Sequence, residues 1–340
     1  MARLSQPPTL AKRWQANIGD HVIGMAWSPD GSLLAAASVS GPITIFDAAG
    51  GSVKHTFKGH GFGTATIAWQ PGGKVLASVG QDGKARLWDT AAGAETAVLD
   101  AGAAWAERVA WNPRGDRFVT AAGKKLRLWD DAGRLVRAYP DQPSTVADVT
   151  WAPRGKEFAA GGYGGVAFFT LDADEPRAKF SWKGSVLALA WSPDGKCIVG
   201  GAQDSSVHFW YLKDGKDLEM SGYPQKVREL SWDTTSTYLA TGGGERVTIW
   251  NCSGKGPAGS TPIDLELHEL PINVLAFQNR GPLLLSACGG GILALWFPAG
   301  WKRVLAQTQI EEGIAQATWA PNDSRIALGG EKGYVAVWSV

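Results

Sequence analysis

A serine, a histidine and an aspartate lie near one another in the first third of the chain, and these are the residue types of a hydrolytic triad. They are His60, Ser78 and Asp82. In such a triad the histidine takes the proton of the serine, and the carboxylate orients the imidazole. Trp88 follows in the same segment, and its indole supplies only a hydrogen-bond donor. The four side chains therefore indicate either acyl-transfer chemistry or a structural hydrogen-bond cluster, and the elements that carry them decide between the two.

Other catalytic and metal-binding motifs are missing from the sequence. It has no Gly-Lys pair followed by Ser or Thr, no G-x-S-x-G elbow and no H-E-x-x-H helix. The glycine clusters at 161–165, 242–244 and 289–291 are expected in turns between strands rather than in phosphate cradles. The 5 histidines show no ligand spacing, and the 3 cysteines are too dispersed for a zinc site or a disulfide scaffold. We therefore predict no catalytic residue, no cofactor and no metal.

The charge balance argues against polyanionic partners. Lys and Arg total 33 and Asp and Glu total 32, which gives a net charge of +1 and no bulk field for nucleic acid or anionic lipid. The first residues lack the apolar core of a signal peptide, and no apolar run reaches the roughly 18 residues of a membrane span. We expect a cytoplasmic protein with no nucleic-acid or membrane partner.

Two aromatic columns recur along the chain and identify internal repeats. The first column precedes a turn and reads Trp27, Trp69, Trp111, Trp151, Trp191, Trp232, Phe277 and Trp319. The second reads Phe46, Trp88, Trp129, Phe169, Trp210, Trp250, Trp296 and Trp338. Of the 17 tryptophans, 13 stand in these columns, whose members are 40 to 46 residues apart. The spacing predicts eight repeats.

Each repeat contains short apolar runs bounded by Gly, Pro and Asp, which is typical of strands joined by tight turns. In the second repeat these runs are residues 64–70, 74–80 and 84–89, and a less regular run follows the second aromatic. The position just before the first aromatic holds only Ala, Ser or Thr. Large and small residues in register predict a crowded repeated core, and no helical period is present. The sequence predicts an all-β fold.

The second repeat, GHGFGTATIAWQPGGKVLASVGQDGKARLWD, resembles the WD repeat, including Gly59-His60 at its start and Trp88-Asp89 at its end. The resemblance extends from about residue 10 to residue 340, although only Trp129-Asp130 repeats the closing dipeptide intact. It implies an eight-bladed β-propeller of four-stranded antiparallel blades. Seven blades with an appended hairpin is the alternative count.

The two ends of the chain complete this expectation. The sequence stops after a third strand at Trp338-Ser339-Val340, and residues 10–18 read as an unused fourth strand. We expect this amino-terminal strand to complete the last blade and close the propeller, because pairing would satisfy an exposed sheet edge. The expected organisation is a tail at residues 1–9 and a single propeller domain at residues 10–340.

The resemblance also assigns roles to side chains. It implies that His60, Ser78, Asp82 and Trp88 form the buried structural tetrad of a WD repeat, which we prefer to the triad. The usual partner face of WD proteins is formed by the loops that enter the first strand and by the turns between the second and third strands. Most residues at these positions are small, and the exceptions that we predict as a protein-binding or peptide-binding rim are His21, Trp105, Glu107, Gln203, Lys226 and Arg228. Trp and Arg are the types that most often dominate interface energies.

We therefore expect a non-enzymatic platform, monomeric on its own, that binds protein or peptide partners. The alternative is a propeller enzyme or a propeller that binds a small molecule or metal. Segments such as DTAAGAET resemble the docking repeats of quinone-dependent dehydrogenases, and Asp148 and Glu229 are candidate ligands of an axial metal. Arg108 stands in the same column and favours internal ion pairing instead. The platform is an inference by analogy, since folds do not fix functions.

Overall fold

The computed structural model describes residues 7–254, 256–298 and 300–340. All the secondary-structure elements of these residues are β-strands, so the all-β prediction is confirmed. The described residues contain no helix that is long and apolar enough to cross a bilayer. The chain consists of two compact units: a central unit, Ile23–Trp191, and a terminal unit, Met1–Val22 with Ser192–Val340. Residues 1–6 of the expected tail lie outside the described residues, and the single domain at 10–340 stays a prediction.

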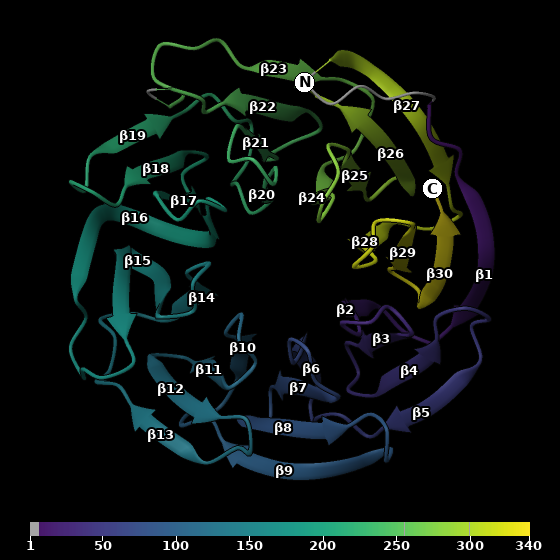
Figure 1. The fold of residues 1–340 in the computed structure, drawn as a ribbon, viewed down its shortest axis with the longest axis vertical. Helices are drawn as coiled ribbons and strands as arrows, with labels where there is room; N and C mark the ends of the chain where they lie inside the picture. The colour runs from purple at the N-terminus through teal and green to yellow at the C-terminus, as the bar shows by residue number, and fades with distance from the viewer. Residues whose placement is uncertain (1–6, 255, 299) are drawn as a thin grey trace. The chain divides into compact units, whose positions relative to one another are not determined.

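Three four-stranded antiparallel sheets of the central unit follow the repeats (Figure 1). The first has the order β2 (Val22–Trp27), β3 (Leu33–Ser38), β4 (Ile43–Asp47) and β5 (Val53–Phe57). The second has the order β6 (Thr64–Trp69), β7 (Val75–Gly80), β8 (Lys84–Asp89) and β9 (Ala94–Asp100). The third has the order β10 (Ala106–Trp111), β11 (Arg117–Ala122), β12 (Lys125–Asp130) and β13 (Leu135–Ala138).

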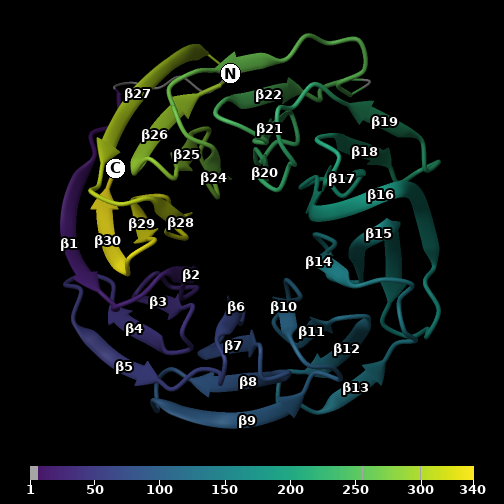
Figure 2. The same cartoon turned by 180° about the vertical axis from the view of Figure 1, so that it is seen from behind.

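Three further four-stranded sheets belong to the terminal unit and are seen from behind in Figure 2. One has the order β20 (Leu230–Trp232), β21 (Tyr238–Thr241), β22 (Val247–Asn251) and β23 (Ile263–Leu265). The next has the order β24 (Ile272–Phe277), β25 (Leu284–Cys288), β26 (Ile292–Phe297) and β27 (Trp301–Gln309). The last has the order β1 (Ala11–Asn17), β30 (Tyr334–Ser339), β29 (Arg325–Gly330) and β28 (Ile314–Trp319).

The prediction of eight separate four-stranded blades is wrong, because the described strands form seven sheets. The fourth and fifth repeats share one six-stranded sheet, with the order β14 (Val146–Trp151), β15 (Glu157–Thr170), β16 (Ala178–Trp191), β17 (Cys197–Ala202), β18 (Val207–Tyr211) and β19 (Asp217–Met220). Seven sheets match the alternative count, but without an appended hairpin.

The length of two strands explains this difference. β15 and β16 have 14 residues each, whereas the first three strands of the second repeat have 6 each. β15 continues through the glycine cluster 161–165, where the sequence suggested a turn, by a register shift between Tyr163 and Gly165. The φ of Gly165 is +117°, a conformation that glycine adopts without a side-chain penalty. β16 joins the last strand of the fourth repeat to the first strand of the fifth without a break.

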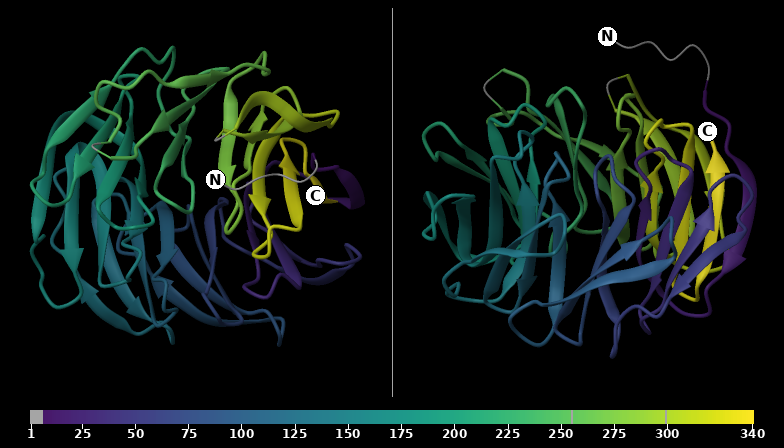
Figure 3. Two further views of the ribbon diagram at one scale, coloured as in Figure 1. Left: turned by 45° about the horizontal axis from the view of Figure 1, so that its top comes forward. Right: turned by 60° about the horizontal axis from the view of Figure 1, so that its bottom comes forward.

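The amino-terminal strand completes the last sheet, as the sequence predicts. β1 pairs antiparallel with β30 from Ala11 opposite Ser339 to Asn17 opposite Tyr334, with one register shift between Lys12 and Trp14. The purple strand lies beside the yellow one in Figure 1 and again in both panels of Figure 3. This pairing brings together segments more than three hundred residues apart and covers an edge that would otherwise expose its backbone groups.

The aromatic columns form the core between neighbouring sheets. Trp111 donates its indole N–H to the Ala68 carbonyl at 3.2 Å, and Trp151 donates to the Ala110 carbonyl at 2.9 Å. Both acceptors occupy the small column of the preceding repeat. Small residues at this position accompany tryptophans such as Trp111 and Trp151, which pack against and hydrogen-bond to the sheet before them. The indole N–H groups of Trp69 and Trp232 are buried without a hydrogen-bond partner among the described residues, so this bond is not made in every repeat.

Candidate functional site

The four side chains of the predicted tetrad form one continuous hydrogen-bond network in the β6–β9 sheet. Trp88 Nε1 donates to Ser78 Oγ at 2.8 Å. Ser78 Oγ lies 2.7 Å from His60 Nε2, and His60 Nδ1 lies 2.8 Å from Asp82 Oδ1. Because the indole only donates and the carboxylate only accepts, the network fixes the proton of a neutral His60 on Nδ1 and lets Ser78 donate to Nε2.

Charges around Asp82 complete this network. Arg86 Nη2 donates to Asp82 Oδ2 at 3.0 Å, and Arg86 Nη1 donates to Glu95 Oε2 at 2.7 Å. Burial acts to raise the pKa of Asp82, but the hydrogen bonds from His60 and Arg86 outweigh it, so the pKa is lowered. Burial lowers the pKa of His60, and the hydrogen bond and charge of Asp82 offset part of that change.

The geometry of this network argues against a hydrolytic triad. Ser78 is 0% exposed and His60 is 3% exposed, so a substrate carbonyl has no route to the serine oxygen. The hydroxyl also accepts a hydrogen bond from the Trp88 indole N–H, which holds it in the core. The cluster is therefore a packing element of the sheet, whose members need one another because each is removed from water.

A second network of the same kind was missed in the sequence. In the terminal unit His268 Nε2 lies 2.7 Å from Ser286 Oγ, and Trp296 Nε1 donates to that oxygen at 2.8 Å. Histidine to serine is 18 residues in both networks, and serine to tryptophan is 10 residues in both. The matched spacing of histidine, serine and tryptophan could have identified this network from the sequence. Gly290 stands at the position of the aspartate, so the network lacks the residue that marks the first one.

Without that aspartate, His268 Nδ1 has no hydrogen-bond partner among the described residues, although the atom is buried. Burial lowers the pKa of His268 to about 4.

A cavity of about 620 Å³ lies wholly within the terminal unit. Its walls come from the loops that precede β20 and β24, from β24 and β28 themselves, and from the turns that follow β21 and β29. Its volume is within the range of about 300 to 1,000 Å³ of typical ligand pockets. The cavity therefore occupies the strand-entry positions at which the sequence predicts a partner site.

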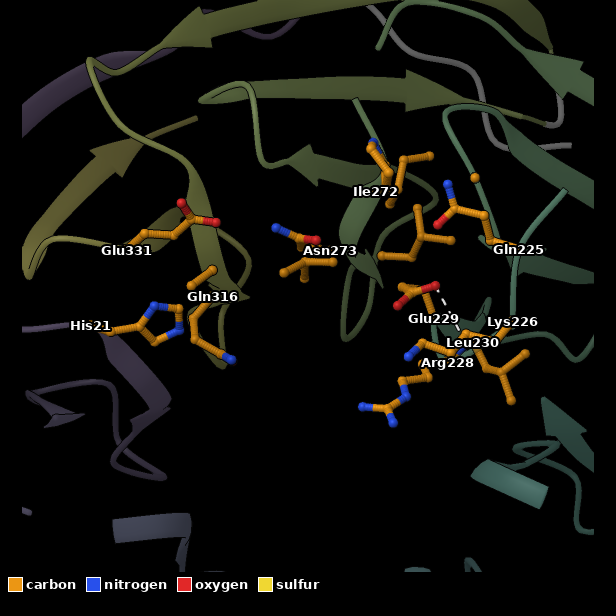
Figure 4. Close-up of a pocket in the computed structure, with 16 residues that line it drawn as sticks. His21, Gln225, Lys226, Arg228, Glu229, Leu230, Ile272, Asn273, Gln316 and Glu331 are labelled. Carbon is orange, nitrogen blue, oxygen red and sulfur yellow. Dashed lines mark hydrogen bonds between the residues drawn. The ribbon is translucent and has the colours of Figure 1, made fainter. Parts of the chain in front are cut away.

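Three of the six predicted rim residues line this cavity: His21, Lys226 and Arg228. Figure 4 shows Lys226 and Arg228 on one side of it and His21 with Glu331 on the other. Lys226, Arg228 and Glu331 are exposed, and their charged groups form no ion pair with any described residue. Glu331 and His21 belong to columns that the sequence marks, but Glu331 was not among the predicted rim residues.

Amide side chains lie between the two charged sides (Figure 4). Asn273 Nδ2 donates to the Ile314 carbonyl at 2.9 Å, which fixes the amide and leaves its Oδ1 as an acceptor. Gln316 lines the cavity beside it. Glu229 is a half-buried carboxyl group on the cationic side. Burial raises its pKa, and the charge of Arg228 offsets part of this increase. The cavity is thus polar and carries fixed charges of both signs.

The other predicted rim residues lie elsewhere. Gln203 is exposed in the terminal unit but does not line this cavity. Trp105 and Glu107 belong to the central unit, where Trp105 is 61% exposed and has a φ of +63°. Phe62, which was not predicted, is 88% exposed with a φ of +65°. Bulky side chains rarely adopt this backbone conformation.

The candidates for a metal site do not assemble one. Asp148 accepts a hydrogen bond from Arg108 Nε at 3.3 Å and another from the Leu189 amide at 2.9 Å, as the column containing Arg108 suggests. Burial raises the pKa of Asp148, and Arg108 offsets part of the increase. Across the described residues no cluster of three or more His, Cys, Asp or Glu side chains could hold an ion.

Comparison with known proteins gives a family. The family model described as the IFT122 first beta-propeller matches residues 21–258. The computationally designed Ika8 protein has a similar structure, with a TM-score of 0.82, 18% sequence identity and coverage of 95% of this chain and 98% of that chain. At this identity the likeness shows the fold alone.

Three curated relatives are similar to part of this chain and match over only part of their own length. "Cell division cycle 20.6, cofactor of APC complex" of Arabidopsis thaliana is 24% identical over 176 residues, which cover 48% of this chain and 40% of the relative. "WD repeat-containing protein slp1" of Schizosaccharomyces pombe is 25% identical over 174 residues, covering 48% and 35%. "Protein HIRA" of Zea mays is 28% identical over 133 residues, covering 30% and 14%. The chain therefore matches less than half of the length of each of these relatives.

Proposed function

The chain belongs to the IFT122 first beta-propeller family, and on this premise we propose that it is a non-enzymatic platform that binds a protein or peptide partner. The observation that carries the proposal is the cavity of about 620 Å³ in the terminal unit, whose exposed charged side chains have no ion-pair partner among the described residues. Charged groups left unpaired at the edge of a cavity are available to a ligand.

The names of the relatives agree with this role. The Arabidopsis relative is named a cofactor of the APC complex, which places that protein in an assembly. We carry over only the general role of an assembly partner. A cytoplasmic location, a monomeric state without its partner and the absence of nucleic-acid and membrane binding belong to the same proposal.

The test is affinity capture with the full chain as bait. We expect the bait to recover specific proteins, and the variant Lys226→Glu/Arg228→Glu to lose them, because it reverses the cationic side of the cavity. Lys124→Glu is the matched control, since Lys124 is an exposed cation of the central unit. Recovery of the same proteins at the same level by all three baits would overturn the proposed site.

A separate measurement addresses the enzyme alternative. The purified chain is tested for bound metal by elemental analysis and for a bound chromophore by its absorbance. We expect neither at stoichiometric amounts. A retained metal or quinone-like absorbance would contradict the platform and favour a propeller enzyme.

A further inference from the structure

Charges of opposite sign lie on opposite sides of the cavity in the terminal unit. Lys226 and Arg228 contribute two cations on one side, and Glu331 contributes a carboxylate on the other (Figure 4). All three side chains are exposed, and no described residue of opposite charge pairs with them. Arg228 interacts electrostatically with the neighbouring carboxyl of Glu229, but no ion pair with a described residue holds any of the three exposed charges, so all three can meet a ligand group of the opposite sign.

We propose that this cavity takes an extended peptide segment with one acidic and one basic side chain at separate positions. The acidic side chain lies against Lys226 and Arg228, and the basic side chain lies against Glu331. This inference rests on the proposed function and names the chemical class of its partner.

The space between the charges suits a peptide backbone. Asn273 Oδ1 is left as an acceptor because Nδ2 is held by the Ile314 carbonyl, and Gln316 offers a second amide next to it. An amide both donates and accepts, which matches the alternating N–H and C=O groups of an extended chain. Ile272 and Leu275 also line the cavity and supply apolar contact.

The charge pattern selects against other ligands. A polyanion such as a nucleic acid or a phosphorylated lipid surface would gain from the two cations but would place further negative charge near Glu331. A divalent cation would find a single exposed carboxylate, and no described cluster of three or more His, Cys, Asp or Glu side chains is suited to metal. A segment with both charges is the ligand that satisfies both sides at once.

The experiment uses short peptides of defined charge against the full chain. Eight-residue peptides with a neutral background carry one Glu and one Lys, in both orders and with one to six residues between them, beside peptides with only one of the charges. Affinities are measured by fluorescence polarisation. We expect one order and one spacing to bind at least about tenfold more tightly than either singly charged peptide, since only that peptide gains a charge-assisted contact on both sides of the cavity.

Charge reversal of the cavity provides the decisive arm. Lys226→Glu/Arg228→Glu/Glu331→Arg should exchange the preference, so that the opposite order of Glu and Lys binds best. Lys124→Glu/Glu175→Lys changes two exposed charges of the central unit and should leave the preference as it is. Because all five positions are exposed, the variants are expected to fold, which thermal unfolding checks.

A second probe separates failure of this inference from failure of the proposed function. A random twelve-residue display library is selected on the full chain, and the selected peptides are tested on Asn273→Trp, which fills the cavity. Peptides that lose binding to this variant but carry no paired acidic and basic residues would overturn the dipolar ligand and leave the platform intact. Peptides that bind it as well as the unmodified chain, or no peptides at all, would overturn both.

Discussion

The same Trp–Ser–His relay occurs in two sheets of this molecule and ends differently. In the β6–β9 sheet the imidazole Nδ1 is 2.8 Å from Asp82. In the β24–β27 sheet the tryptophan and serine contacts are the same to within 0.1 Å. There Nδ1 of His268 is buried without a partner among the described residues. The relay itself therefore forms without the carboxylate.

The difference shows what the aspartate adds. Asp82 accepts a hydrogen bond from the imidazole Nδ1–H, and Arg86 balances the carboxylate charge. In the other sheet Gly290 replaces the aspartate, and Ala294 stands where the arginine does. Loss of the acid together with its counter-ion leaves one orphaned N–H rather than an unpaired buried charge, which is the less costly of the two defects.

The largest expected effect is acid destabilisation through His268. Its pKa falls from 6.5 to about 4 on folding, so the unfolded chain takes up the proton first. Stability is then fully present above pH 6.5 and is lost as the pH falls from 6.5 towards 4, by on the order of 3 kcal/mol. Urea unfolding at a series of pH values measures this loss, and histidine NMR measures the pKa directly.

The control is His268→Gln, which lacks a titrating group. It should be less stable at pH 7 but should show a smaller loss of stability between pH 6.5 and 4. We expect the contribution of His60 to that loss to be smaller than that of His268, because Asp82 favours the protonated imidazole. A pKa of His268 near 6.5, or an unchanged pH slope in His268→Gln, would contradict this account.

The next effect in size is the removal of the carboxylate from the complete network. Asp82→Ala leaves the His60 N–H buried without an acceptor, as in His268, and should lower the free energy of unfolding by about 1 to 3 kcal/mol. Thermal and urea unfolding measure the loss. Partner affinity at low temperature should change little, because Asp82 acts within the sheet.

Asp204→Ala is the matched control for this substitution. Asp204 occupies the equivalent position of the fifth repeat, but it is exposed and its carboxylate accepts a hydrogen bond from Ser206 rather than from a histidine. We expect a change within about 0.5 kcal/mol. Lost partner binding in Asp82→Ala at unchanged stability would show that the network is a binding site and not a structural element.

Much of the fold follows from residue types that repeat. The aromatic and small columns locate the strands, since tryptophans such as Trp111 and Trp151 hydrogen-bond to the small column of the preceding sheet. The pairing of β1 with β30 follows from the two incomplete ends. The six-stranded sheet does not follow, because a glycine cluster such as 161–165 is compatible with a turn or with an irregular strand. Only the neighbouring β16 selects the strand.

The candidate site is predicted in part for a related reason. The strand-entry positions used for the prediction are two residues apart, so their side chains can face the same side of the strand. The fold brings three of the residues at these positions to one cavity: His21, Lys226 and Arg228. Asn273 stands in the same strand-entry column as Glu107, and Glu331 stands in the same turn column as Gln203. Residue type does not separate these pairs, so the prediction includes Glu107 and Gln203 but misses Asn273 and Glu331. Trp105 and Glu107 satisfy the same column rule within the other unit. A column gives a position within a repeat but does not show which repeats supply one cavity.

The smallest effect is the most direct test of the comparison, because it converts one network into the other. Gly290→Asp places a carboxylate at the position of Asp82, and the following glycines, Gly83 and Gly291, have φ values of +70° and +79°. A Cβ at Gly290 would meet its nearest atom, Cys288 Sγ, at 3.5 Å, which is ordinary contact. We expect a gain of about 1 kcal/mol in unfolding free energy, a raised pKa of His268 and a shallower loss of stability in acid.

Gly289→Asp is the control for this gain, since it adds the same charge one residue earlier, where the repeat of the complete network has Gln81. It should change neither the pKa of His268 nor its share of the acid sensitivity. The carboxylate introduced by Gly290→Asp has no arginine beside it, because Ala294 pairs with Ser286 where Arg86 pairs with Ser78. If Gly290→Asp destabilises the chain while Gly290→Asp/Ala294→Arg restores the gain, the aspartate and its counter-ion act only as a unit. If neither raises the pKa of His268, the two sheets differ in more than this one side chain, and the equivalence drawn from their matched spacing is wrong.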